Sequence, residues 1–290
     1  MRRILYALPL IGCQHSPEEE LQSFCPRDSG GVTTDSFDTG LAVTDEGPSQ
    51  LPPEAGYVFT QILGGLEFPV DLVSLGDGTL LIAGKLGQIA HVDPQTGTVL
   101  GEARVDEMIS LPTEVEEGLL SLAIDPDPSA AQRDVLYTWQ TTQHQTENSL
   151  VRWDLELEPF DLSNPTEVLR ITKWQTGLAT HNGGKLLWWS GESEEPVLYV
   201  SVGNGGGSGN NSVGQNLEHP SAGILAMSFD ADGQPVPAFE SPFGHELLVA
   251  KGLRNPWRMT DCGAVICIGD VGESSFEELN LYTGVGNNFG

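Results

Sequence analysis

Basic residues are scarce in this sequence. Its 290 residues include 13 lysines and arginines against 41 aspartates and glutamates, a formal net charge of −28 at pH 7. A chain of this charge is repelled by phosphate backbones and by anionic lipid headgroups. We therefore expect no nucleic-acid partner. The acidic excess suits divalent cations and solubility in salt, and it equally suits the general surface of a secreted protein.

Motifs of several enzyme classes are also missing. The sequence has no CxxC, HExxH or GxSxG, so nothing supports a zinc site, thioredoxin-like redox chemistry or a serine nucleophile elbow. The glycine-rich run at 203–211 misses the GxGxxG spacing and opens no helix, which argues against a dinucleotide site. Helical periodicity of useful length is absent, and no Gly-X-Y period indicates collagen.

The N-terminus has no apolar run long enough to span a bilayer. A basic start, Met1–Arg3, precedes a short apolar run, and Leu10–Cys13 resembles the bacterial lipoprotein signal, in which the cysteine is lipidated after cleavage. A frayed hydrophobic N-terminus in a cytosolic protein is the alternative. Residues 1–13 are thus expected to be a lipoprotein-type signal, and the polar residues 14–55 a disordered tether. We expect an exported protein, in the periplasm or at the bacterial cell surface, that meets the membrane only through its lipid anchor.

Cysteine is rare, with four residues in the chain. If Cys13 carries the lipid, Cys262 and Cys267 flank a glycine-containing turn between two strand-like runs. A local disulfide can form there in an oxidising compartment if the two Cα atoms come within about 7 Å. Cys25 would be left over.

What the sequence does contain is a repeated pattern of short β runs and turns, with 35 glycines and 19 prolines. The clearest unit has β runs at 70–75, 79–83 and 88–92, and Asp-Gly between such runs is a strong hairpin signal. Similar units start near Tyr57, Gly118, His181 and His245. The pattern predicts an all-β protein with a β-propeller domain at 56–290, and a β-sandwich is the alternative.

Two phrases near the end of the chain are not required by core packing. Gly252–Trp257 (GLRNPW) places Arg254 and Asn255 directly before a proline, which ends any strand there, so Arg254 should project from a strand end. Gly269–Gly272 (GDVG) closes a β-branched run and is followed by an acidic pair, so several oxygens can converge as a hard cation requires. A loop cap, a surface ion pair and solvated acids are the ordinary alternatives.

A third phrase, His181–Leu186 (HNGGKL), places an imidazole at the entrance of an apolar strand with little side-chain cover behind it. A loop histidine with satisfied hydrogen bonds is the ordinary alternative.

Together these phrases resemble the glucose/sorbosone dehydrogenase family of soluble sugar dehydrogenases that use pyrroloquinoline quinone (PQQ). GLRNPW, GDVG followed by EELN, and the stretches at 65–70 and 117–126 carry the resemblance, which covers about residue 57 to residue 290. The family has six-bladed propellers, and about four blades' worth of sequence is present. Family members continue beyond the phrase that Gly286–Gly290 resembles, so we expect an incomplete, C-terminally truncated propeller.

The resemblance implies an oxidoreductase that oxidises an aldose at its anomeric carbon to a lactone and passes electrons from PQQ to an external acceptor. His181 resembles the catalytic base, which takes the proton of the anomeric hydroxyl as a neutral imidazole. Arg254 would stabilise the reduced quinone, and Asn255 would hydrogen-bond the same cofactor. A non-catalytic propeller that binds a protein or glycan partner, like the hedgehog-interacting relatives of the family, is the alternative.

The resemblance also implies a calcium ion that bridges PQQ to the backbone carbonyls of Gly272 and Glu273, with Glu277 and Glu278 helping to hold calcium nearby. At Glu116–Glu117 the sequence departs from the family, which often has a glutamine before Gly-Leu-Leu. Glu116 is therefore predicted to lie against the cofactor. A negative charge beside an anionic cofactor is unfavourable unless a metal or an arginine offsets it.

Overall fold

The computed structural model describes residues 61–105, 116–126, 135–142, 147–173, 180–191, 193–206 and 211–290. The chain divides into two units, Met1–Gln61 and Ile62–Gly290, and all the described strands belong to the second. The predicted lipoprotein signal, the tether and Cys25 lie outside the described residues. Within the described part of the chain, no helix is long and apolar enough to cross a membrane.

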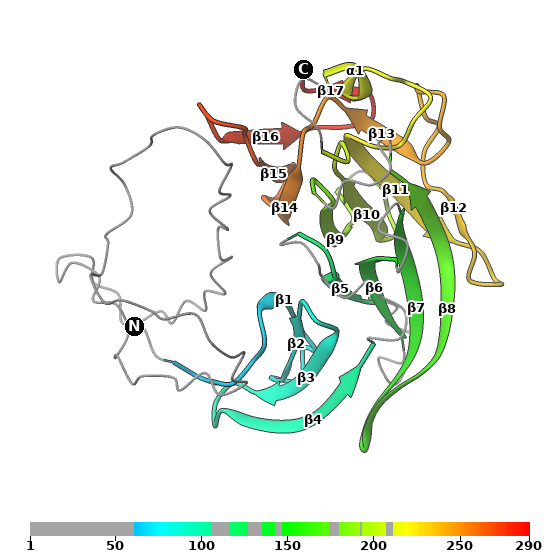
Figure 1. Ribbon diagram of the computed structural model, residues 1–290. Coiled ribbons are helices and arrows are strands. Elements are labelled where there is room, and N and C mark those ends of the chain that lie inside the picture. The colour runs from blue at the N-terminus through cyan, green and yellow to red at the C-terminus, as the bar shows by residue number, and fades with distance from the viewer. Residues whose placement is uncertain are drawn as a thin grey trace, which may run out of the picture. The chain divides into compact units, whose positions relative to one another are not determined.

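The first two sheets are four-stranded antiparallel meanders in which each strand pairs with the next (Figure 1). The hairpins predicted at 70–92 are present, and the Asp77 carboxylate closes the first turn by accepting a hydrogen bond from the Thr79 backbone (2.8 Å). The first sheet contains β1 Pro69–Ser74, β2 Leu80–Gly84, β3 Gln88–Asp93 and β4 Thr98–Arg104. The second contains β5 Leu119–Ile124, β6 Val135–Thr141, β7 Glu147–Leu157 and β8 Phe160–Thr172.

The third sheet holds one strand that the sequence assigned elsewhere. The sequence predicts a fourth unit that starts near His245, but β13 pairs with β11 and completes the third sheet. A hydrophobic run such as Leu248–Lys251 predicts a strand but does not identify the strand it pairs with. After β13 the backbone turns out of the third sheet at Gly252, which has a φ of 88°. This sheet contains β9 Gly183–Trp189, β10 Val197–Val202, β11 Gly223–Phe229, β12 Pro235–Pro237, β13 Leu248–Lys251 and β17 Asn287–Asn288.

The fourth sheet is three-stranded and contains β14 Pro256–Asp261, β15 Ile266–Asp270 and β16 Glu278–Tyr282. A single short helix among the described residues, α1 Asn211–Gly214, follows β10. The four sheets succeed one another with β1, β5, β9 and β14 on the inner side (Figure 1). This is the all-β, four-blade propeller arrangement that the sequence predicted.

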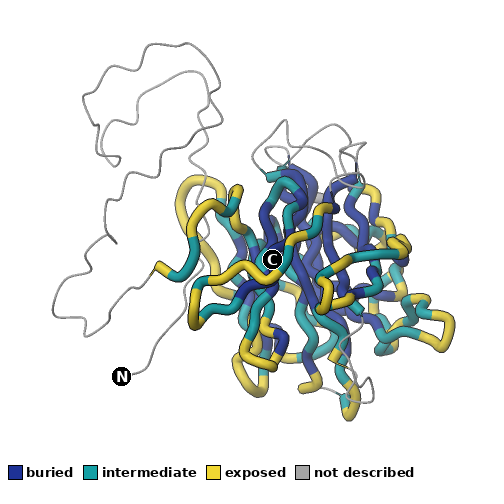
Figure 2. The backbone as a smooth tube through the Cα atoms, turned by 90° about the horizontal axis from the view of Figure 1, so that it is seen from below, coloured by how far each residue is buried: buried dark blue, intermediate teal, exposed yellow. Residues whose placement is uncertain are grey.

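The buried apolar side chains of the described residues form three clusters, one between each pair of successive sheets. Strand β10 shows how the pattern arises, because successive side chains of a strand point to opposite faces. Leu198 and Val200 pack toward the second sheet, whereas Val197 and Tyr199 pack toward the fourth. The buried backbone accordingly occupies the middle of the sheets, and the exposed backbone lies mostly in the turns (Figure 2).

The third residue of each inner strand contributes to a polar cluster on the inner side of the sheets. These residues are Asp71, Ser121, Lys185 and Arg258. The Asp71 carboxylate accepts hydrogen bonds from Lys185 Nζ (2.7 Å) and Ser121 Oγ (2.5 Å). We call this set the axial cluster, because it joins all four sheets where their inner strands meet.

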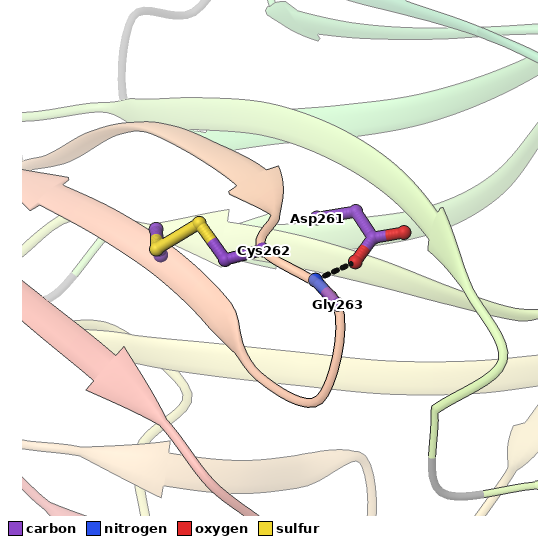
Figure 3. Close-up of a disulfide and its surroundings, with 4 residues drawn as sticks. Asp261, Cys262 and Gly263 are labelled. Atoms are coloured by element: carbon purple, nitrogen blue, oxygen red, sulfur yellow. Dashed lines mark hydrogen bonds between the residues drawn. A yellow bond between two sulfur atoms is a disulfide. The ribbon is translucent and has the colours of Figure 1, made fainter.

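Cys262 and Cys267 form the local disulfide considered from the sequence, with their Cα atoms 5.9 Å apart (Figure 3). The bond closes the hairpin between β14 and β15, and the backbone N–H of Gly263 in the same turn donates to the Asp261 carboxylate (2.7 Å). The bridge therefore lies at the end of β14 opposite to Arg254.

Candidate active site

His181 lies at the entrance of β9 in a left-handed backbone conformation, with φ of 53°. Only a few per cent of residues other than glycine adopt this region, and such outliers gather at functional sites. The backbone of Gly203 packs directly against the His181 carbonyl oxygen. A Cβ atom at position 203 would collide with that oxygen, so this position requires glycine. The His181 side chain is largely buried, at 9% exposure.

Asn204 determines which ring nitrogen of His181 is basic. The Asn204 Oδ1 atom accepts a hydrogen bond from the Gly206 backbone (2.9 Å), which identifies it as the oxygen, and it lies 2.7 Å from His181 Nδ1. Because the Asn204 oxygen can only accept a hydrogen bond, His181 Nδ1 must be the donor. Nδ1 therefore carries the proton, and Nε2 keeps its lone pair. Burial lowers the pKa of His181 below the ordinary histidine value, so the imidazole is neutral at pH 7.

Glu116 connects the segments that precede three inner strands. Its carboxylate accepts a hydrogen bond from the His181 backbone N–H (2.5 Å), and Asn255 Nδ2 lies 3.5 Å from the same oxygen. Its backbone carbonyl accepts a hydrogen bond from Asn182 Nδ2 (2.9 Å). Asn255 Oδ1 in turn accepts from the Gly183 backbone (3.0 Å). Glu116, His181 and Asn255, which are far apart in the sequence, thus meet in one hydrogen-bonded network.

Arg254 lies between β13 and β14. The proline after Asn255 predicted the end of a strand, but β14 begins at Pro256. Asp270 shapes this turn, because its two carboxylate oxygens accept hydrogen bonds from the backbone N–H groups of Arg254 (2.8 Å) and Asn255 (2.6 Å). Burial raises the pKa of Asp270, and these two hydrogen bonds act against that rise. The Asn204 backbone N–H donates to the Arg254 carbonyl (2.8 Å), so one residue contacts both His181 and Arg254.

A cavity of about 350 Å³ opens beside Arg254. Its lining includes the aromatic residue Phe289 and the polar residues Asn204, Gln215, Arg254, Asp270, Glu273 and Glu278. His181 does not line it directly and lies behind Asn204. The volume falls within the range of ordinary small-molecule sites.

The residues predicted to hold calcium lie in the loop after β15. Gly272 and Glu273 line the cavity, as does Glu278, whereas the Glu277 carboxylate accepts a hydrogen bond from the Gly272 backbone (3.0 Å). The Gly272 carbonyl already accepts a hydrogen bond from Arg254 Nη1 (3.0 Å). The described part of the chain contains no group of three or more acidic, histidine or cysteine side chains placed to hold a metal. Two of the predicted ligands are backbone carbonyls and the described acids near them form no ready-made side-chain cluster, so calcium remains a prediction from the resemblance.

Sequence reasoning missed two contributors to this site. Asn204 lies in the glycine-rich run and Asp270 in the GDVG phrase, so both were visible as polar residues after strands, but their partners were not.

The fold and the site define a β-propeller in which a hydrogen-bonded network joins the segments before three inner strands, with a polar cavity beside Arg254. Residues 66–290 match the glucose/sorbosone dehydrogenase family, and the chain belongs to it.

Two solved structures support this membership. The PQQ-bound aldose sugar dehydrogenase of Streptomyces coelicolor is 27% identical with a TM-score of 0.62, and the match covers 79% of this chain and 64% of that one. A putative glucose dehydrogenase of Thermus thermophilus is 26% identical with a TM-score of 0.61, and the match covers 79% of this chain and 65% of the other. The chain thus spans less than two thirds of the length of either relative.

Proposed function

We propose that this protein is a PQQ-dependent oxidoreductase that oxidises an aldose at its anomeric carbon to the lactone. The observation that carries the proposal is that Asn204, which lines a cavity of about 350 Å³ together with Arg254, holds the His181 imidazole through Nδ1 and leaves Nε2 basic, while its backbone N–H donates to the Arg254 carbonyl. The family and its PQQ-bound member support the same chemistry.

The residues present suit an anionic cofactor in part. Arg254 is the one cation among the described residues that line the cavity, and Asp270, Glu273 and Glu278 bring negative charge to the same walls. Arg254 would hold PQQ, with Asn255 and Glu116 next to it in the same network. When bound, PQQ supplies a two-electron acceptor for the hydride that leaves the sugar carbon.

His181 takes the proton of the anomeric hydroxyl on Nε2 while the C1–H bond breaks, so the sugar loses one proton and one hydride and becomes the lactone. Asn204 holds the ring in the required tautomer through Nδ1, and burial keeps the imidazole neutral. An external acceptor then reoxidises the cofactor, which completes the electron balance.

The test is reconstitution of the purified chain with PQQ and calcium, followed by dye reduction with a panel of aldoses. We expect sugar-dependent dye reduction that His181→Ala abolishes without loss of PQQ binding. His245→Ala is the matched control, because this histidine is also partly buried, but its Nδ1 accepts a hydrogen bond from the Leu247 backbone (3.3 Å) instead of contacting Asn204. Absence of PQQ binding in a calorimetric titration would instead favour the non-catalytic propeller that binds a protein or glycan.

We also propose that the protein is exported and anchored through Cys13. The Cys262–Cys267 disulfide supports an oxidising compartment, because such bonds rarely persist in the cytosol. Labelling with a radioactive fatty acid, lost in Cys13→Ser, tests the anchor.

A further inference from the structure

Asp270 is a buried acid that no chemical step of the proposed reaction uses. It is the last residue of β15, it is 4% exposed, and it pairs with Pro256, the first residue of β14. Each of its carboxylate oxygens accepts one backbone N–H, Oδ2 from Arg254 (2.8 Å) and Oδ1 from Asn255 (2.6 Å). An asparagine could accept only one of these hydrogen bonds, because its second terminal atom is a donor. The contacts at this position are therefore specific for a carboxylate.

No strand ladder provides these two hydrogen bonds. Gly252, with φ of 88°, turns the chain out of the third sheet after β13, and β14 begins only at Pro256. The N–H groups of Arg254 and Asn255 thus lie between two strands, and the Asp270 carboxylate accepts both. A buried N–H group without an acceptor is costly, so the turn depends on this carboxylate for its conformation.

The same strand end also holds the Arg254 side chain. Arg254 Nη1 donates to the carbonyls of Val271 (2.8 Å) and Gly272 (3.0 Å), the two residues that follow Asp270. The Val271 N–H in turn donates to the Asn255 carbonyl (3.1 Å). The backbone and the guanidinium of Arg254 are thus attached to one short segment, so a displacement of the turn would also displace the guanidinium.

The turn also contacts the residues that hold His181. The Arg254 carbonyl accepts the Asn204 backbone N–H (2.8 Å), and Asn204 Oδ1 lies 2.7 Å from His181 Nδ1. Asn255 Oδ1 accepts the backbone N–H of Gly183 (3.0 Å), two residues after the histidine. The conformation of this turn therefore bears on the imidazole as well as on the guanidinium.

We propose that Asp270 is a positioning residue, which holds the turn at Arg254 and Asn255 in the conformation that places Arg254 at the cavity. Its effect on cofactor affinity rests on the proposed function. Its hold on the turn does not, because those hydrogen bonds are made within the chain itself. The alternative is that Asp270 acts on an anionic cofactor only through its negative charge at the cavity wall. The two roles predict opposite effects of Asp270→Asn on PQQ binding.

The first experiment is hydrogen exchange of the Arg254 and Asn255 amides in the full chain without cofactor. The Gly263 amide is the internal reference, because it also donates to a carboxylate, that of Asp261 (2.7 Å), but in an exposed turn. In the natural chain we expect the two amides to be protected at least about tenfold more than that of Gly263. Asp270→Asn keeps the shape of the side chain and only one acceptor oxygen. We expect it to accelerate exchange at both amides by about tenfold or more.

The second experiment is calorimetric titration of the same variant with PQQ in the presence of calcium. A positioning role predicts that the Kd for PQQ rises by about tenfold or more. Loss of a charge at the cavity wall alone predicts that it falls. If the natural chain does not bind PQQ, the proposed function is wrong, and the exchange result alone decides whether Asp270 holds the turn.

Asp71→Asn is the matched control. Asp71 is also a buried aspartate, at 8% exposure, and it accepts the Leu122 backbone N–H (3.0 Å) and pairs with Lys185 (2.7 Å) in the axial cluster. This variant should lower the melting temperature, yet leave exchange at Arg254 and the Kd for PQQ within about threefold of the original values. Equal acceleration of exchange in the two variants would show a general loss of stability, and the proposal would be wrong.

Unprotected Arg254 and Asn255 amides in the natural chain, or unchanged exchange in Asp270→Asn, would overturn the proposal. So would an unchanged or lower Kd for PQQ in this variant. If Asp270→Asn does not fold, Asp270→Glu replaces it, because the added methylene keeps the charge but displaces both oxygens. A positioning role then predicts faster exchange at the two amides, whereas a role of the charge alone predicts none.

Discussion

Arg258 on the innermost strand of the fourth sheet reaches the backbone of Val70 on the innermost strand of the first. Its Nη2 atom donates to the Val70 carbonyl at 2.5 Å, across 188 residues of sequence. The same guanidinium lies over the Trp257 ring, 4.4 Å from its centre, and its Nη1 atom donates to the Trp257 carbonyl. One side chain therefore ties the first and fourth sheets together next to the Asp71–Lys185 ion pair.

We expect Arg258→Met to lower the free energy of unfolding by about 2 to 3 kcal/mol, because it leaves the Val70 carbonyl without its donor and removes a cation near Asp71. Urea denaturation measures the loss. The matched control is Arg170→Met, which removes an exposed ion pair with Glu147 and Glu167 and should cost less than about 1 kcal/mol. If both variants lost the same free energy of unfolding, the Arg258–Val70 contact would contribute no more to stability than an exposed ion pair.

The pH dependence of sugar oxidation should reflect the buried His181. Burial lowers its pKa below 6.5, and only the neutral ring accepts a proton, so the rate should persist as the pH falls through 6.5 and decline below it. The same shift means that the folded state binds fewer protons than the unfolded one in this window, so stability also falls as the pH drops through it.

Asn204→Asp should move that profile in a known direction. A carboxylate on Nδ1 favours the charged imidazole and should raise the pKa of His181, which shifts the acid limb of kcat/KM toward neutral pH. An unshifted limb would mean that another group controls it.

Calcium removal should weaken cofactor binding. The walls of the cavity carry Asp270, Glu273 and Glu278, which repel an anionic quinone, and a divalent cation offsets them. We expect a chelator to raise the Kd for PQQ by about tenfold or more, equivalent to at least ~1.4 kcal/mol. In Glu273→Gln/Glu278→Gln the dependence on calcium should shrink, and titration calorimetry reads both effects.

The disulfide should matter for stability and not for the site. It closes a loop of only a few residues, so replacing both Cys262 and Cys267 with serine should cost at most about 2 kcal/mol of unfolding free energy. The bridge is separated from Arg254 by the length of β14, roughly 20 Å for its six residues. PQQ affinity should therefore be unchanged, and a loss of affinity would reveal coupling along β14.

Much of the local structure could be predicted from the sequence. Apolar runs and an Asp-Gly turn placed the first three strands of the first sheet to within about two residues, because both signals act between neighbours in the chain, whereas β4 was not predicted. The proline after Asn255 marked a strand boundary near Arg254, although a strand begins at Pro256 and does not end there. The assignment of Leu248–Lys251 failed, because a short buried strand has the same pattern whichever sheet it joins.

The candidate site was likewise predictable in its residues but not in the contacts between them. His181, Arg254, Asn255 and Glu116 could be proposed from phrases that resemble a family. The tautomer of His181 required the position of Asn204, and the network around Glu116 required its hydrogen bonds to the His181 backbone and to Asn182.

The amino-acid sequence by itself determined the all-β class, the hairpins and the turn closed by Cys262 and Cys267. Each of these depends on side-chain alternation or on residues a few positions apart. Only the tertiary structure decided which strands share a sheet, and which polar groups meet at the axis. Those choices depend on hydrogen bonds and charges between segments up to 188 residues apart, whose free energy exists only once the sheets have packed.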